Sequence, residues 1–407
     1  MTEHTPSDEI DPDASADTAR TPAAGDVTAD WNPRGPSVRR DPLAAYDGMR
    51  SYCPVARGVS GAWTLFAHAD VTGAARDSQT YSNAVSRYLQ VPNGLDGPTH
   101  TSYRALVDRY FTRERMTAVE PVVQRVAREL VAELDVPGRI DAVAVGSRFA
   151  VRAQCAWLGW PADLEDELLR WMADNHAATR SRDRARTAQV AERFDAIIRS
   201  LTAARRVAGE HAPDDVTTEL VRDRVEGREL TDEEIVSILR NWTGGDLGSM
   251  ALCTGVVLTY LADHPDLQDR LRAGVSDREL DAVLDEILRI DDPFVANRRV
   301  TTEPVRVGGR QLAAGDTVFL NWTSANRDPK VFGDPDAFDP VGNAPYNLVW
   351  GAGKHVCPGR PLATLELRAL TRAVLDATAV VEPDPGRPRQ RGLPPVGGFS
   401  AAPLRLG

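Results

Sequence analysis

The stretch Trp350–Ala363, which reads Trp-Gly-Ala-Gly-Lys-His-Val-Cys-Pro-Gly-Arg-Pro-Leu-Ala, constrains the fold of this chain more than any other feature. It places one cysteine, Cys357, in a glycine-rich loop directly before a run with helical spacing. A sulfur at a helix N-terminus faces free N–H groups and the positive end of the helix dipole, and both favour a thiolate. Gly351 and Gly359 let the backbone pass close to a flat, bulky group, and His355 adds a donor for a nearby anion. Such a loop suits axial ligation of a haem iron by the cysteine.

A buried structural cysteine is the alternative explanation, but the whole motif around Cys357 would then have to arise by chance. The motif resembles the haem-ligand loop of cytochromes P450, with Trp350 where most members have Phe. The resemblance implies a mainly α fold with small β-sheets, and one haem b ligated by Cys357 between this loop and a long glycine-rich helix. Thiolate ligation favours O–O cleavage, so the resemblance also implies a monooxygenase that activates O2.

The net charge of −11 is concentrated at the N-terminus, where residues 1–30 hold eight acidic residues and one basic residue. This segment has almost no large apolar residue, so we predict a disordered acidic tail over 1–30. We predict a single catalytic domain over 31–407. Because the remaining chain is only weakly acidic, its charge does not favour a nucleic-acid partner.

No feature of the sequence predicts export or membrane insertion. The N-terminus is acidic and apolar-poor, and the longest apolar stretches are interrupted by charge before the length that a membrane span needs. The four cysteines lie far apart, which disfavours a disulfide scaffold or a zinc site. We therefore expect a cytoplasmic protein.

Two cationic residues one helical turn apart, His100 and Arg104, follow a helix start at Pro98. Such a pair could clamp a carboxylate or phosphate, although a solvated helix face is the commoner explanation. Beside the cysteine loop, the pair resembles the family segment that binds one haem propionate. The resemblance assigns the second propionate to Arg299, in preference to Arg298.

Thr231-Asp-Glu-Glu234 is a capping box that opens a long helix to about Ala262. Gly244, Gly245 and Gly248 lie inside it, and each costs about 1 kcal/mol relative to alanine. Close approach of a flat ligand or a local bulge would explain this cost, and a tight helix–helix crossing is the alternative.

The same helix departs from the acid–threonine pair of the family. Leu247 stands at the acid position and Gly248 at the threonine position, with Asp246 one residue early and Ser249 one residue late. One residue is a rotation of about 100°, so Asp246 replaces the usual acid only if the helix bulges. We predict that protons pass through Ser249 and ordered water, or through substrate atoms, and we take Asp246, Gly248 and Ser249 as the catalytic segment.

Glu286 and Arg289 lie three residues apart on a predicted helix. This spacing alone is weak, but its place before the cysteine loop resembles the Glu–Arg pair of the family. The family usually has an arginine four residues after Phe338, where this chain has Gly342 followed by Asn343. We expect Asn343 or a backbone carbonyl to complete the network.

The run Arg240–Ser249 resembles the corresponding helix of aromatic O-demethylases that act on guaiacol-like methoxyarenes. This implies a small, apolar pocket, and its predicted lining is Tyr81, Trp171, Gly244, Leu247, Phe294, Val295 and Phe399. For Trp171, core packing is an equal alternative. The predicted reaction is hydroxylation of the methyl carbon, followed by release of formaldehyde. One alternative is a hydroxylase or epoxidase of a larger secondary metabolite, and another is a haem-binding sensor without turnover.

The cysteine spacing and chain length leave no room for a fused flavin or iron–sulfur domain. We therefore expect electrons from NAD(P)H to arrive through a separate ferredoxin or flavin/iron–sulfur reductase. Lys354 and Arg360 are the expected docking residues above Cys357, and they suit an acidic partner.

Overall fold

The computed structural model describes residues 29–181 and 183–407. The predicted acidic tail lies outside the described residues except at its last two positions. Asp30 is bound to the folded part, because its carboxylate accepts from the backbone N–H of Arg57 (2.7 Å) and from the guanidinium of Arg310 (2.6 Å). The described part of the folded domain therefore includes Asp30, one residue before the predicted boundary.

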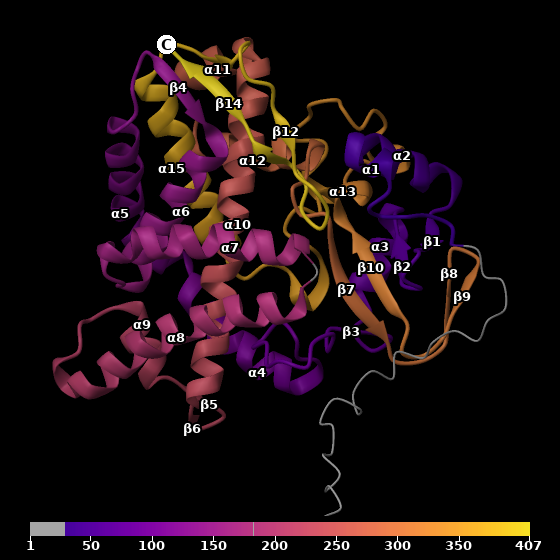
Figure 1. The fold of residues 1–407 in the computed structure, drawn as a ribbon, viewed down its shortest axis with the longest axis horizontal. Helices are drawn as coiled ribbons and strands as arrows, with labels where there is room; N and C mark the ends of the chain where they lie inside the picture. The colour runs from indigo at the N-terminus through magenta and orange to yellow at the C-terminus, as the bar shows by residue number, and fades with distance from the viewer. Residues whose placement is uncertain (1–28, 182) are drawn as a thin grey trace, which may run out of the picture.

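Most helices form one side of the molecule, and the five-stranded sheet with the β8–β9 hairpin lies on the other (Figure 1). The helices of the first side are α4 (Gly97–Asp108), α5 (Arg113–Ala132), α6 (Ala142–Leu158), α7 (Glu165–Ser181), α8 (Arg184–Ala208), α9 (Val216–Arg222), α10 (Asp232–Asp263), α11 (Pro265–Arg272), α12 (Asp277–Ile290) and α15 (Arg360–Ala377). Short 3-10 helices are η1 (Arg109–Phe111), η2 (Ala162–Leu164), η3 (Gly209–His211), η4 (Ala344–Tyr346) and η5 (Gly353–His355).

The largest sheet has five strands in the order β1 (Val55–Arg57), β2 (Trp63–Leu65), β10 (Thr317–Asn321), β7 (Ala296–Thr301) and β3 (Tyr81–Ser82). All neighbours are antiparallel except β2 and β10. The short helices of this side are α1 (Pro36–Arg40), α2 (Pro42–Tyr52), α3 (His68–Arg76), α13 (Trp322–Ala325) and α14 (Pro329–Phe332).

Four smaller sheets complete the described fold. One has three strands in the order β11 (Val381–Pro383), β14 (Pro403–Leu406) and β4 (Gly138–Asp141), and the others are the hairpins β5 (Arg224–Val225) with β6 (Arg228–Glu229), β8 (Val305–Val307) with β9 (Arg310–Leu312), and β12 (Gln390–Arg391) with β13 (Phe399–Ala401). Gly308 and Gly309, both at positive φ, form the turn of the β8–β9 hairpin. The turn at residues 314–316 leads from β9 to β10, which belongs to the five-stranded sheet.

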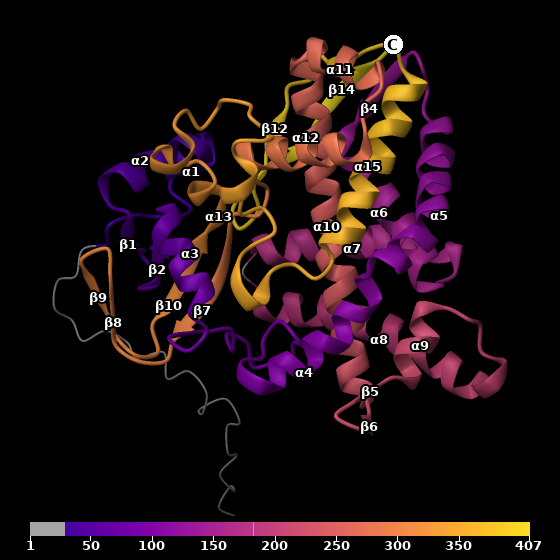
Figure 2. The same cartoon turned by 180° about the vertical axis from the view of Figure 1, so that it is seen from behind.

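Helix α10 runs through the centre of the helical side in both views (Figures 1 and 2). Its predicted capping box is formed, with Glu234 N–H donating to Thr231 Oγ1 (3.3 Å) and Thr231 N–H donating to Glu234 Oε2 (2.8 Å). By length and composition α10 could cross a membrane, which the sequence analysis did not anticipate. However, 72% of its apolar window is buried inside the structure, so this apolarity serves the core.

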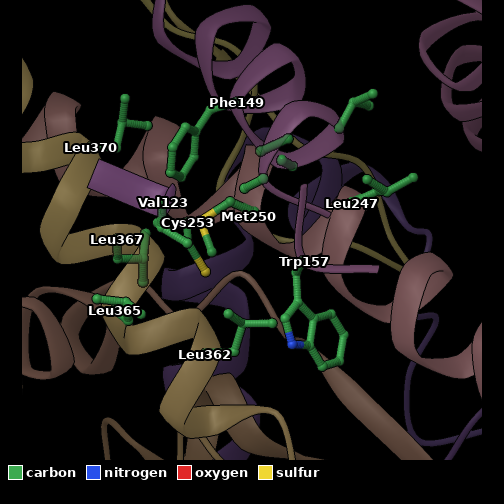
Figure 3. Close-up of a cluster of buried hydrophobic side chains, with 14 of the residues drawn as sticks. Val123, Phe149, Trp157, Leu247, Met250, Cys253, Leu362, Leu365, Leu367 and Leu370 are labelled. Carbon is green, nitrogen blue, oxygen red and sulfur yellow. The ribbon is translucent and has the colours of Figure 1, made fainter. Parts of the chain in front are cut away.

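The closest helix crossing in the core joins α10 to α6. A Cβ on Gly146 would lie 2.6 Å from Thr254 Cβ, and a Cβ on Gly255 would lie 2.8 Å from Val143 Cγ2, so both glycines are required by packing. Around this crossing, α5, α6, α10 and α15 contribute one apolar cluster (Figure 3).

Candidate active site

Cys357 lies in the loop between η5 and α15. Its backbone N–H donates to the carbonyl of Trp350 (2.9 Å), which closes the loop. Burial raises the pKa of the Cys357 thiol, while backbone hydrogen bonds from Gly359 and Arg360 to the sulfur lower it. The predicted amide donors are therefore in place around the sulfur.

Two glycines of this loop face a large cavity. Gly351 has φ +76°, a conformation that glycine adopts without strain. A Cβ on Gly351 would meet nothing within 4 Å, and one on Gly359 would lie 3.9 Å from Cys357 Sγ. The loop thus offers an open backbone surface beside the sulfur, as a flat macrocycle requires.

His100, His355 and Arg299 form a buried group of donors near the same cavity. His100 is 3% exposed and Arg299 6%, and the two histidine rings are 4.1 Å apart. Burial lowers the pKa of Arg299 to about 10, and burial together with His100 and Arg299 lowers the pKa of His355 to about 4. His355 Nε2 has no hydrogen-bond partner among the described residues and lies 3.7 Å from the Asp96 carboxylate. Buried donors so poorly paired need an anion.

Arg104 takes a different position from the one expected of a propionate ligand. Its guanidinium donates to the carbonyls of Lys354 (3.1 Å) and Val356 (2.7 Å) and pairs with Asp108 (2.6 Å). It fastens α4 to the cysteine loop and does not line the cavity. A contact between Arg104 and a haem carboxylate therefore stays a prediction.

These residues fit a haem. The sulfur of Cys357 is a suitable axial ligand, Gly351 leaves room for the macrocycle, and the donors of His355 and Arg299 face the cavity where carboxylates would lie.

The cavity has a volume of about 1340 Å³ and reaches from the cysteine loop to α10 and α7. Gly244, Gly245 and Gly248 all line it. A Cβ on any of the three would meet no atom closer than 3.5 Å, and α10 continues through them without a bulge. The tight crossing occurs at Gly146 and Gly255 instead, so the glycines of the Gly244–Ser249 segment open the cavity.

Five of the predicted substrate contacts line this cavity, namely Trp171, Gly244, Phe294, Val295 and Phe399. Trp171 stacks on Phe194 with ring centroids 3.9 Å apart and donates its indole N–H to the carbonyl of Val190 (3.0 Å). Trp171 therefore packs in the core and also lines the cavity, and its contact with a ligand stays a prediction.

The predictions for Tyr81 and Leu247 are wrong. Tyr81 belongs to β3 and packs in the apolar cluster of the five-stranded sheet with residues such as Trp63. Leu247 is fully buried and lies with Met250 and Cys253 in the helical core (Figure 3). Leu247 is turned by about 100° from Gly248, and its side chain packs in the apolar core cluster.

The cavity is also less apolar than the small, apolar pocket that we expected. Polar side chains line the cavity together with the aromatic ones, and they include Asn83, Gln90, Asn175, His176, Asn241 and Asn297. A ligand that fills this cavity therefore meets hydrogen-bonding groups on several sides.

Asp246 lines the cavity and lies within hydrogen-bonding reach of Glu366 on α15 and Gln154 on α6. Asp246 Oδ2, Gln154 Oε1 and both oxygens of Glu366 have no donor among the described residues. Burial raises the pKa of Asp246 to about 7, and burial together with Asp246 raises the pKa of Glu366 well above its usual value. The contact is satisfied only when one carboxyl holds a proton, so we call Asp246, Glu366 and Gln154 the acid cluster.

The Glu286–Arg289 pair is fully buried, with Arg289 Nε donating to Glu286 Oε2 (2.8 Å). Arg289 also donates to the backbone carbonyls of residues 326, 335 and 337. Asn343 Nδ2 donates to Glu286 Oε1 (2.7 Å). Asn343 is therefore confirmed as the replacement for the missing arginine at Glu286. The backbone group that joins it is the N–H of Asp339, which donates to Glu286 Oε1 (3.0 Å), and not a carbonyl.

The sequence analysis missed Glu366, Gln154 and His176. A signal existed for Glu366, because it stands four residues after Leu362 on the apolar stripe of α15, where a carboxylate is out of place. His176 lies five residues after Trp171 on α7, and nothing in that spacing marks it as a cavity residue. No signal in the sequence distinguishes Gln154 from other polar residues on α6.

Comparison with known proteins agrees with this site. Residues 161–391 match the family model described as Cytochrome P450. Cyclomarin C epoxidase CymV of Salinispora arenicola is 33% identical over 354 residues, which cover 82% of this chain and 88% of that protein. Erythromycin C-12 hydroxylase of Saccharopolyspora erythraea is 30% identical over 343 residues, which cover 80% of this chain and 84% of that protein.

Solved structures show the same fold. A mutant of P450 EryK in complex with erythromycin B superposes with a TM-score of 0.80 at 26% identity, over 90% of this chain and 96% of that one. HmtN, a post-tailoring hydroxylase of himastatin biosynthesis, gives a TM-score of 0.78 at 26% identity, over 90% and 97% of the two chains. The chain belongs to the bacterial cytochrome P450 family and is a haem-thiolate monooxygenase.

Proposed function

We propose that this P450 hydroxylates or epoxidises a secondary metabolite larger than a methoxyarene. The observation that carries the proposal is the mixed polar and aromatic lining of the cavity, because a small planar ether would leave its amides unpaired. The volume of about 1340 Å³ has to hold the haem as well as the substrate, so it does not by itself set the size of the substrate. The names of the relatives support it, since they are an epoxidase of cyclomarin C and a hydroxylase of erythromycin.

In this proposal Cys357 is the iron ligand, and His100, His355 and Arg299 hold the haem carboxylates, with Arg104 bracing the loop. The bound haem supplies reductive activation of O2, and the protein supplies orientation and protons. Because His355 and Arg299 lack carboxylate partners at hydrogen-bond distance among the described residues, the haem carboxylates would offset the cost of burying them.

The apolar wall of the cavity positions the substrate. Trp171 is held by its stack on Phe194 and by its indole hydrogen bond, so it presents a rigid face beside Gly244. Phe294, Val295 and Phe399 line the same cavity and exclude water from the reacting carbon. The absence of a side chain at Gly244 leaves room for a bulky ring or a branched group next to Trp171.

The acid cluster is the proposed proton store for oxygen activation. Asp246 faces both Glu366 and the cavity, and at neutral pH the pair holds at least one proton. Ser249, which also lines the cavity, would carry the proton onward through water. Gly248 leaves space for that water, since a Cβ there would meet no atom closer than 3.5 Å.

Aromatic O-demethylation is the weaker assignment. It rests on the Arg240–Ser249 run alone, and two of its expected pocket residues, Tyr81 and Leu247, do not reach the cavity. The acid cluster also gives the site a proton source, which a binding sensor without turnover would not need.

Electrons from NAD(P)H would reach the haem through a separate ferredoxin or flavin/iron–sulfur reductase in the cytoplasm. Lys354 is exposed beside the cysteine loop, whereas Arg360 is paired with Asp285 (2.9 Å), so Lys354 is the freer docking charge of the two.

A spectral screen of the purified haem protein tests the substrate proposal. We expect macrocyclic and cyclic-peptide metabolites to displace the water from the ferric haem and to shift its Soret band, and methoxyarenes to give a weaker shift or none. A shift with methoxyarenes alone would overturn the assignment.

A further inference from the structure

Gly248 stands at the position where the family carries a threonine, and the side chain of His176 lies opposite it. His176 lies on α7 and lines the cavity. A Cβ on Gly248 would lie 3.5 Å from His176 Nε2, which is ordinary van der Waals contact. The imidazole therefore borders the space that a side chain at position 248 would occupy.

His176 is available to bind a ligand. Within residues 29–181 and 183–407, its ring has no hydrogen bond or ion pair to another side chain or to the backbone. Burial, with a smaller effect from Arg180, lowers the pKa of His176, so the ring is neutral at physiological pH. A neutral imidazole offers one N–H donor and one acceptor nitrogen.

The wall that carries His176 is well supported. Earlier on the same helix, Trp171 is fixed by its stack on Phe194 of α8 and its bond to Val190. On the facing helix, Gly248 keeps the space in front of the imidazole open. The imidazole of His176 on α7 is thereby held against the Gly248 segment of α10.

We propose that His176 is a hydrogen-bond donor of the cavity wall opposite Cys357, and that it holds an oxygen-bearing ligand over Gly248 in place of the missing hydroxyl. The ligand is a diatomic molecule that the haem iron would bind beside Gly248. The inference rests on the proposed function only in requiring a haem in this cavity, and not on the identity of the metabolite.

Infrared spectroscopy of the ferrous protein with bound carbon monoxide tests this role, because a nearby donor lowers the C–O stretching frequency. We expect His176→Phe to raise that frequency and to weaken cyanide binding to the ferric protein by roughly tenfold, the loss of one hydrogen bond to a charged ligand. His176→Gln retains a donor and should stay closer to the wild type. Adding Gly248→Thr to His176→Phe should bring the C–O stretching frequency and the cyanide affinity back toward the wild-type values, because the threonine supplies a hydroxyl donor.

Asn175→Ala is the matched control, since Asn175 is the neighbouring polar residue that lines the cavity without contacting Gly248. It should leave both readouts unchanged. An unaltered C–O stretch and cyanide affinity in haem-loaded His176→Phe would overturn the proposal, and His176→Leu serves as the same test if the Phe variant does not take up haem. Neither readout needs a substrate or a reductase, so the result is independent of the metabolite assignment.

Discussion

Replacing Asp246 with asparagine should stabilise the protein, and more so as the pH rises. The pKa of Asp246 is raised in the folded state from 3.8 to about 7 by burial, and the pKa of Glu366 is raised as well. A carboxyl with a raised folded-state pKa binds its proton more tightly in the folded than in the unfolded chain. The cluster therefore favours folding most at low pH, and this contribution is lost as the pH rises from about 4 through 7.

The size of this gain in stability follows from the oxygens of Glu366 that lack a hydrogen-bond donor. The amide introduced by Asp246→Asn would be neutral and could donate its N–H to Glu366, whose side-chain oxygens have no donor among the described residues of the wild type. A buried polar group without a partner costs about 1–3 kcal/mol. At about pH 8 the free energy of unfolding of the variant should therefore exceed that of the wild type by this amount. At about pH 5.5, where the acid cluster of the wild type is protonated, the difference should shrink below about 1 kcal/mol.

Thermal unfolding of the haem-loaded proteins at both pH values measures the effect. For a chain of this length the expected rise in melting temperature at the higher pH is about 1–4 °C. Asp269→Asn, which changes an exposed carboxylate on α11, is the matched control and should have no such pH dependence. A loss of stability in Asp246→Asn at the higher pH, or a gain of equal size at both, would refute the protonated acid cluster.

Three further changes test other parts of the site. Asn343→Ala removes a donor from buried Glu286 and should lower the free energy of unfolding by about 1–3 kcal/mol in urea, whereas retention of full stability would show that the amide is dispensable. Arg299→Gln should speed the transfer of haem to apomyoglobin by roughly tenfold or more, and an unchanged rate would remove Arg299 from the haem contacts. Gly244→Leu should fill the space beside Trp171 and weaken the spectral response to bulky ligands more than to small ones; equal weakening of both would show that Gly244 does not set the size limit.

The cysteine loop and the capped long helix could be predicted because their patterns are local. The amide donors around the Cys357 sulfur are those of the first residues of α15, so they follow from the position of Cys357 just before this helix. The capping box of α10 depends only on the four residues Thr231–Glu234. The same four-residue pattern at Ser276–Glu279 is formed only in part. Ser276 Oγ accepts from the backbone N–H of Glu279 (3.2 Å), while the Glu279 carboxylate pairs with Arg270 of α11, so a tertiary ion pair competes here with a local hydrogen bond.

The lining of the cavity could not be predicted to the same degree, since it depends on helix rotation and on contacts between distant elements. Leu247 and Gly248 are neighbours in sequence, yet one lies in the core and the other lines the cavity. Glu366 and Asp246 meet across two helices that are far apart in the sequence. For the substrate, a resemblance along a single helix suggested a small ether, whereas the polar lining of the cavity favours a larger metabolite.

Turnover with labelled dioxygen is the most direct test of the proposed function. The haem protein would be combined with a ferredoxin, its reductase and NADPH, and incubated with the metabolite that gives the largest spectral shift. We predict that one labelled oxygen atom enters this metabolite as a hydroxyl or an epoxide, in step with NADPH consumption. Release of formaldehyde from methoxyarenes, with no labelled product from any larger metabolite, would contradict the account.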